Sequence, residues 1–304
     1  MTDPGPSNPF GVDADRDGPQ DAGARGGTDP GALAGALLHR RRVAHLLPGA
    51  APPSFAFGAL TRRPDQVSLN ADRLRALVET TDLAPVGPLT IPPSVPPVTD
   101  PIGDEPLVPI AGPGLRVLGA YRIEGWRHTV AGGFLRVSVA ERLARVAAAL
   151  PEPFGLAVFD AWRPLALQAA LFDVAYADPT LPPGFVAEPD PDPTTPPAHL
   201  TGGTVDLTLS FDGVPLALGT GFDDFTTTAH ADRFEDDAGA PPAIGAEAER
   251  RLVIRDLRRL LVATMASEGF VVLDCEWWHF EHGTRYWAAI TGAAPRFGPT
   301  SLDP

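Results

Sequence analysis

Hydrophobic residues recur at helical spacing in three segments of the chain. Leu143, Val146 and Leu150 predict a helix over 138–150, which Ser138 and Glu141 would open as a capping box. Two further helices are predicted by the same spacing: one that begins near Pro164 and buries Leu167, Ala170, Leu171 and Val174, and one over 247–269 that buries Leu252, Leu257, Leu260, Leu261 and Met265.

Short apolar or alternating runs predict strands between these helices. The run 156–159 is typical of a buried strand, and 204–210 alternates, with Val205, Leu207 and Leu209 toward the core. Shorter strand pieces are expected at 115–117, 121–123 and 270–273. Because strands and helices are mixed and joined by Pro-rich crossings, the pattern indicates an α+β fold rather than a regular βαβ series.

Proline and glycine mark the expected domain boundaries. The chain contains 36 prolines, most of them outside the periodic segments, and the first residues are rich in Gly, Pro, Asp and Ser without periodicity. The expected divisions are a disordered tail (1–30), a Pro-rich extension with short helices at 31–47 and 70–80 (31–103), a folded domain (104–294) and a C-terminal tail (295–304).

Charge and cysteine content exclude several classes of protein. The net charge of −14 would repel a polyanionic backbone, so a nucleic-acid partner is not expected. The single cysteine, Cys275, excludes an intramolecular disulfide and a thiolate-rich metal site. No apolar run is long enough to span a bilayer and no signal peptide is convincing, so we expect a cytoplasmic protein without a membrane partner.

His199 and Asp206 are the first candidates for metal ligands. Gly202 and Gly203 disfavour a helix between them, so we expect a loop that brings His199 back over a strand bearing Asp206. Taken alone, the pair is weak evidence, because a surface histidine and an ordinary strand aspartate explain such a pair more often than a metal does.

Glu276 and His279 form a second candidate pair within 271–280, a segment that reads as one strand. An unbroken strand would point the two side chains to opposite faces. A shared metal site therefore requires a bend, bulge or turn between them. The alternative is an aromatic core strand with an edge glutamate and a hydrogen-bonded histidine.

Arg163 follows the buried strand and precedes a helix. Its permanent charge could stabilise the oxyanion of a tetrahedral intermediate, or it could form a salt bridge with Asp160. Together, His199, Asp206 and His279 as ligands, Glu276 as general base and Arg163 as cation would make a mononuclear zinc hydrolase site with one Zn²⁺ per chain.

Four motifs in this order resemble the zinc D-alanyl-D-alanine dipeptidases of the vancomycin-resistance type, which share a fold with the Hedgehog signalling domain. The motifs are Phe159-Asp-Ala-Trp-Arg-Pro164, His199-x-x-Gly-x-x-x-Asp206, Gly219-Thr-x-Phe-Asp223 and Glu276-Trp-Trp-His279. The resemblance covers about residues 104 to 290.

The resemblance implies a Hedgehog/DD-peptidase-like α+β fold, a small dipeptide such as D-Ala-D-Ala as substrate, and the same zinc ligands and base. It further implies that Asp223 receives the substrate ammonium group. The family usually has a serine two residues before the first ligand, where this chain has Pro197 followed by Ala198. The alternatives are a D,D- or L,D-carboxypeptidase acting on peptidoglycan stem peptides and a non-catalytic binding module with the same fold.

Overall fold

The structure is a computed structural model that describes most of the chain beyond residue 82 and short pieces before it. The described residues are 45–48, 57–67, 72–74, 76, 83–89, 92–101, 105–181, 183–235 and 245–302. The tail over 1–30 and most of the helices expected over 31–47 and 70–80 lie outside these residues.

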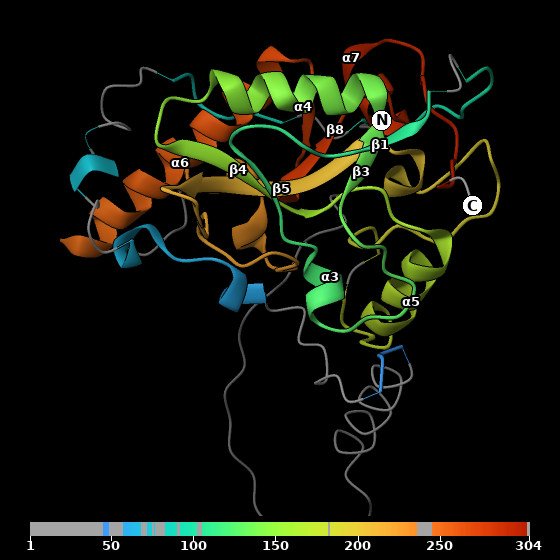
Figure 1. The fold of residues 1–304 in the computed structure, drawn as a ribbon, viewed down its shortest axis with the longest axis horizontal. Coiled ribbons are helices and arrows are strands. Elements are labelled where there is room, and N and C mark those ends of the chain that lie inside the picture. The colour runs from blue at the N-terminus through green and yellow to red at the C-terminus, as the bar shows by residue number, and fades with distance from the viewer. Residues whose placement is uncertain are drawn as a thin grey trace, which may run out of the picture.

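A mixed six-stranded sheet forms the centre of the molecule (Figure 1). Its strand order is β2-β4-β5-β8-β7, with β6 paired to β5, and only β2 and β4 run parallel. Two shorter strands, β1 and β3, pair separately. The strands are β1 (Leu107–Pro109), β2 (Leu115–Val117), β3 (Phe134–Arg136), β4 (Phe154–Asp160), β5 (Thr204–Phe211), β6 (Val214–Pro215), β7 (Val271–Leu273) and β8 (Glu276–Glu281).

Helices cover the sheet from both sides. In the view of Figure 1, α4 lies above the sheet, whereas α3 and α5 lie below it. None of the helices in the described part of the chain is long and apolar enough to cross a membrane. The α-helices are α3 (Ala120–Ile123), α4 (Val137–Ala149), α5 (Leu165–Ala175), α6 (Ala246–Ser267) and α7 (Arg285–Thr291), and the 3-10 helices are η1 (Phe57–Leu60), η2 (Pro64–Gln66), η3 (Ala198–Thr201) and η4 (Thr227–Ala229).

Strand β5 lies in the middle of the sheet and is buried along its whole length. The predicted apolar face is confirmed, since Val205, Leu207 and Leu209 are fully buried. The opposite face is polar and also buried, and Thr208 satisfies its hydroxyl by donating to the carbonyl of Leu216. Asp206 on that face is therefore held in a rigid, water-poor position.

Helix α4 buries the predicted stripe, but the capping box expected at its start is wrong. Arg136 is the N-cap residue, and Ser138 lies inside the helix. The backbone N–H of Ser138 donates instead to the carboxylate of Glu105 at 2.9 Å, so a distant acidic side chain caps the helix.

Two other local predictions are wrong. Residues 121–123 form part of α3 rather than a strand, because Gly119 adopts a left-handed conformation (φ 66°) and turns the chain. Leu252 is 50% exposed rather than inward-facing, whereas Ile254 and Arg258 are buried from α6.

Residues of the Pro-rich extension contribute to the same core as the sheet. Leu46, Phe57, Val67 and Val86 are buried and belong to one hydrophobic cluster with β4 and β5. Ring contacts continue this packing, since Phe57 lies 5.0 Å from Phe222 between ring centroids. These parts of the extension therefore pack against the sheet that carries the candidate site.

Candidate metal centre

His199, Asp206 and His279 come together in the structure, although they lie on three different elements. His199 lies in η3, while Asp206 on β5 is the cross-strand partner of His279 on β8. All three side chains are buried, and one ligand atom from each lies within 4.8 Å of the others, an arrangement that could hold a metal ion.

The hydrogen bonds of the two histidines leave one lone pair of each aimed at Asp206. Nδ1 of His199 lies 2.7 Å from the carbonyl oxygen of Ala161, which can only accept, so Nδ1 carries the proton. Its Nε2 then presents a lone pair 3.2 Å from Oδ2 of Asp206.

His279 repeats this pattern with its nitrogens exchanged. Its Nε2 lies 2.9 Å from Oε1 of Glu281 and carries the proton when the ring is neutral. Nδ1 then faces Oδ1 of Asp206 with a lone pair, at 3.0 Å. Oδ1 of Asp206 is buried and has no hydrogen-bond partner. Acceptor atoms that converge in this way need a proton or a metal cation between them. Burial lowers the pKa of His279, but Asp206 and Glu281 raise it well above its ordinary value, so the site attracts positive charge. Two imidazole nitrogens and a carboxylate are a donor set that fits a divalent metal.

A bulge between β7 and β8 allows Glu276 and His279 to reach the same site. Val272 pairs with Phe280, but the next residue, Leu273, pairs with Glu276, so the residues between Glu276 and Phe280 bulge out of register. Oε2 of Glu276 consequently lies 3.6 Å from Nδ1 of His279. The break in strand geometry required by the sequence is present, together with a turn after β7 that divides the segment expected as one strand.

Glu276 has the electrostatic environment of a general base. Burial raises the pKa of its carboxyl to about 7, with a further increase from Asp206 and an opposing decrease from His279. A carboxylate whose pKa is close to neutral can both accept and return a proton.

Arg163 forms the salt bridge with Asp160 and also faces the metal ligands. Its Nε donates to Oδ2 of Asp160 at 2.8 Å, and its Nη1 donates to Oε1 of Gln168 at 2.7 Å. Nη2 lies 3.5 Å from Oδ2 of Asp206. The two interpretations of this arginine are therefore compatible, since Asp160 and Gln168 fix the guanidinium beside the site.

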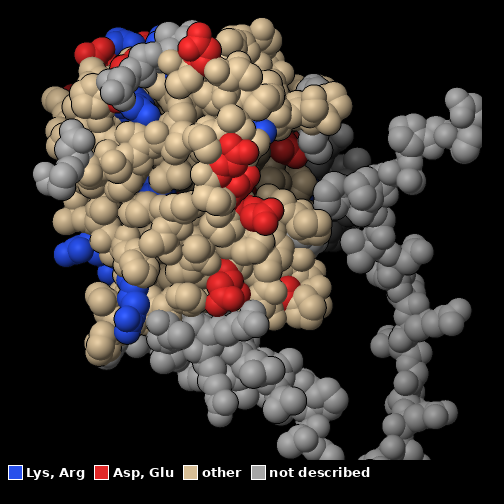
Figure 2. Space-filling model, turned by 90° about the vertical axis from the view of Figure 1, so that its right-hand side faces the viewer, with Lys and Arg blue, Asp and Glu red and all other residues tan. Residues whose placement is uncertain are grey.

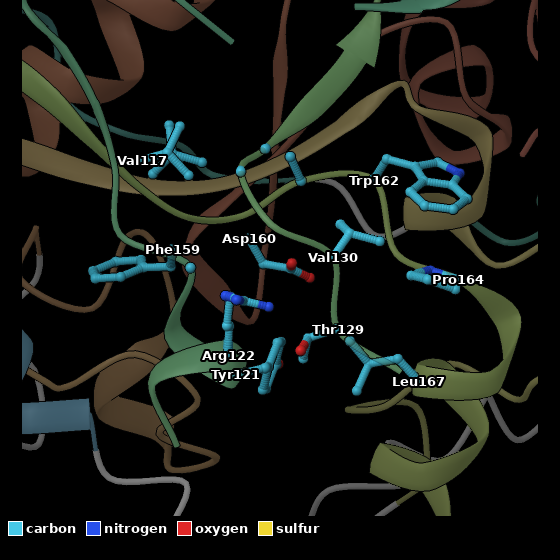
Figure 3. A pocket seen from close by; sticks show the side chains of 15 residues that line it. Val117, Tyr121, Arg122, Thr129, Val130, Phe159, Asp160, Trp162, Pro164 and Leu167 are labelled. Atoms are coloured by element: carbon cyan, nitrogen blue, oxygen red, sulfur yellow. The ribbon is translucent and has the colours of Figure 1, made fainter. Parts of the chain in front are cut away.

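Asp160 also borders a small cavity whose lining residues do not include Arg163. The cavity has a volume of about 20 Å³, space for roughly one water molecule. Figure 3 shows Asp160 directed into it, with Val130 and Thr129 nearby. Burial raises the pKa of Asp160, and the charge of Arg163 opposes this increase.

Asp223 is buried and lines the same cavity as the metal ligands. Its Oδ2 accepts a hydrogen bond of 2.7 Å from the hydroxyl of Tyr121, and its backbone has a positive φ of 55°. Burial raises the pKa of Asp223 well above its ordinary range, and Glu276 and Asp206 raise it further. A cationic group that enters the cavity would relieve this electrostatic cost.

The cavity around these residues has a volume of about 330 Å³, near the lower end of the range for small-molecule sites. The Pro-rich loop before His199 contributes Phe185 and Ala187 to its wall. On the face seen in Figure 2, most of the charged residues in the middle of the surface are Asp and Glu, and some of them lie next to a hollow.

Three residues of the site were not identified from the sequence: Glu281, Tyr121 and Gln168. Glu281 lies two residues after His279 on the same strand, so a search for carboxylates on the face of a ligand would have found it. Tyr121 and Gln168 reach the site only through tertiary packing, and no local pattern signals them.

Among the residues that the structure describes, the other histidines and Cys275 lie outside the centre. His282 is buried between Phe270 and Trp287, and His45 pairs with Asp173 at 2.9 Å. Cys275 lies in the turn after β7 rather than in a strand, and burial raises the pKa of its thiol. A protonated thiol is a poor nucleophile.

The fold and the His-Asp-His centre define a metallopeptidase-like architecture, and comparison with known proteins agrees. Residues 127–291, more than half of the chain, match a family described as "D-ala-D-ala dipeptidase". The chain belongs to this family, and its mixed α+β architecture is consistent with the expected Hedgehog/DD-peptidase fold.

Two curated relatives carry the name D-alanyl-D-alanine dipeptidase. The chain is 30% identical over 178 residues to the protein of a Synechocystis species. This alignment covers 51% of this chain and 71% of the relative. The chain is also 35% identical over 131 residues to the protein of Escherichia coli. This second alignment covers 41% of this chain and 54% of that relative.

Proposed function

We propose that this chain is a zinc-dependent dipeptidase that hydrolyses D,D-dipeptides such as D-Ala-D-Ala, with one Zn²⁺ held by His199, Asp206 and His279. The observation that carries the proposal is the convergence of three buried lone pairs beside Glu276. Two imidazole nitrogens and one carboxylate oxygen are donors that zinc favours, and a fourth coordination position would remain for catalysis. When bound, zinc would supply Lewis-acid activation of water and of the scissile carbonyl.

Glu276 is the proton carrier in this proposal. Its Oε2 takes the proton of the attacking water and then delivers it to the nitrogen of the leaving amine, so the amide C–N bond breaks without a covalent enzyme intermediate. The nearly neutral pKa of the buried Glu276 carboxyl supports both steps.

Arg163 stabilises the negative oxygen that develops on the scissile carbonyl. Its guanidinium is fixed by Asp160 and Gln168 before substrate arrives, so little reorganisation is needed during the reaction. Nη2 is the edge directed toward the ligands, at 3.5 Å from Asp206.

Asp223 receives the free amino group of the substrate, and Tyr121 holds its carboxylate in place. The position of Asp223 on the wall of the same cavity favours a dipeptidase over a carboxypeptidase, because an acylated substrate has no ammonium group to pair with it. Because burial penalises the charged form of Asp223, which has no salt-bridge partner among the described residues, a substrate ammonium group would relieve this electrostatic cost.

The experiment compares D-Ala-D-Ala with N-acetyl-D-Ala-D-Ala, using zinc-loaded wild type and the Asp223→Asn variant. We expect wild type to prefer the free dipeptide by at least about a hundredfold in kcat/KM, and Asp223→Asn to lose most of this preference. Preferential cleavage of the acetylated substrate by wild type would instead identify a carboxypeptidase.

A further inference from the structure

The cavity beside His199, Asp206 and His279 has a second cavity as its neighbour. This second cavity has a volume of about 300 Å³, which is large enough to contain a further amino-acid residue. The two cavities adjoin each other, because they share five wall residues: Val95, Ala187, Ala198, Glu281 and Tyr286.

The two cavities lie at different ends of the site. Tyr121 and Asp223 border only the first cavity, whereas Ala198 and Tyr286 border both. A peptide with its amino group at Asp223 and its first amide bond at the metal ligands would therefore extend its C-terminal part into the second cavity. Pro197 and Ala198 place no polar side chain along this path.

Arg285 is the only cationic side chain among the described residues that line the second cavity. Its Nε donates to the carbonyl of Pro96 at 2.8 Å, and its Nη2 donates to the carbonyl of Val95 at 3.1 Å. Backbone carbonyls orient a guanidinium without neutralising it. Within the described part of the chain no carboxylate lies at ion-pair distance from Arg285. The pKa of Asp190 is lowered mainly by its hydrogen bonds from Thr195 and Asp192 and, to a smaller extent, by the charge of Arg285. Arg285 therefore presents an anchored positive charge that Asp190 balances only in part.

The acidic groups around this cavity are already engaged or lie at its rim. Asp190 accepts hydrogen bonds from the Thr195 hydroxyl and from the backbone N–H of Asp192. Glu281 accepts from His279 and Thr284, and Glu188 is exposed to solvent. Arg285 is thus the side chain best suited to an incoming carboxylate.

We propose that the second cavity binds the residue that follows a D,D-dipeptide unit and that Arg285 binds the C-terminal carboxylate of that residue. The substrates would then include tripeptides with a free amino terminus. This inference rests on the proposed function. Water adds across the first amide bond, whose C–N bond breaks, so the first residue gains a carboxylate and the remaining dipeptide gains an amine.

The test uses D-Ala-D-Ala-Gly and its C-terminal amide, with D-Ala-D-Ala as reference and products identified by mass spectrometry. We expect wild type to release D-Ala and D-Ala-Gly first, with a kcat/KM within about tenfold of that for D-Ala-D-Ala. The free acid should be cleaved at least about tenfold more efficiently than the amide, as expected for a charge-assisted contact.

Variants at Arg285 test the carboxylate contact through the acid-to-amide ratio measured within each protein. This ratio cancels any general effect of losing the contacts to Val95 and Pro96. Arg285→Met should bring the ratio close to one, mainly by raising KM for the acid, and Arg285→Lys should retain an intermediate ratio.

The outcomes separate the two proposals. Turnover of D-Ala-D-Ala without turnover of the tripeptide would overturn the second subsite and leave the proposed function intact. Equal rates for the acid and the amide in wild type would also overturn the second subsite, and so would first release of D-Ala-D-Ala and glycine. Neither result would contradict the proposed function. If neither peptide is hydrolysed, the proposed function fails and this inference fails with it.

Discussion

His279 and Glu281 are hydrogen bonded within strand β8, with Nε2 of the imidazole 2.9 Å from Oε1 of the carboxylate. This contact fixes which nitrogen of His279 is free to face Asp206. Thr284 donates to the other oxygen of Glu281, so the carboxylate is held from two sides. In the proposed zinc site, Glu281 would therefore orient His279 as a ligand without touching the metal itself.

The first prediction follows from this contact. Glu281→Gln keeps the shape of the side chain but removes its charge, which lowers the basicity of His279. We expect the affinity for Zn²⁺ to fall by about 10- to 100-fold, measured by competition with a chromophoric chelator. Glu268→Gln, which alters a carboxylate paired with Arg145 far from the site, is the matched control. Unchanged zinc affinity in Glu281→Gln would contradict this role.

The second prediction concerns Arg258, a buried cation that holds the loop bearing Asp223. Its guanidinium donates to the carbonyls of Leu218, Thr228 and His230, and it lies 5.6 Å from the ring centroid of Trp277. Substitution leaves these carbonyls buried without donors and frees the loop.

Arg258→Met should therefore lower the free energy of unfolding by about 3 kcal/mol in urea denaturation and raise KM for D-Ala-D-Ala. Arg255→Met, on the same helix, removes a half-buried arginine that pairs with Asp256. This control should lower the free energy of unfolding by less than about 1 kcal/mol. Similar losses of stability in the two variants would show that Arg258 has no special role.

The third prediction concerns the pH dependence of stability at His282. Burial, together with Arg142 and Arg296, lowers the pKa of His282 to about 4. The unfolded chain has a histidine pKa of about 6.5, so it binds a proton that the folded protein rejects. The contribution of neutral His282 to the free energy of unfolding is complete above pH 6.5 and is lost as the pH falls toward 4.

Between pH 8 and pH 5, wild type should therefore lose about 2 kcal/mol more stability than His282→Phe, which keeps an aromatic ring between Phe270 and Trp287. Urea denaturation at both pH values measures the difference. Parallel losses in the two proteins would exclude His282 as the source.

The elements that depend on local pattern could be predicted from the sequence. The alternation in β5, the stripe of α4 and the apolar run of β4 each reflect a period set by backbone geometry. The need for irregular backbone between Glu276 and His279 could also be predicted, because a general base and a ligand three residues apart cannot share a face of a regular strand.

The parts that depend on distant partners could not be predicted. Glu105 caps α4 from a separate segment, and Tyr121 reaches Asp223 from a helix that follows a left-handed glycine. Arg258 occupies an inward position because carbonyls of a remote loop satisfy it. In each case the stabilising partner lies far away in the sequence, where periodicity carries no information.

The most direct test of the zinc-dipeptidase account measures bound zinc and D-Ala-D-Ala turnover on the same samples of wild type and Glu276→Gln. The account predicts one Zn²⁺ per chain in both proteins and a loss of kcat of about 10²- to 10⁴-fold in the variant, because the proton carrier is removed while the three ligands remain. Wild-type protein that takes up zinc without hydrolysing the dipeptide, or a Glu276→Gln variant as active as wild type, would contradict it.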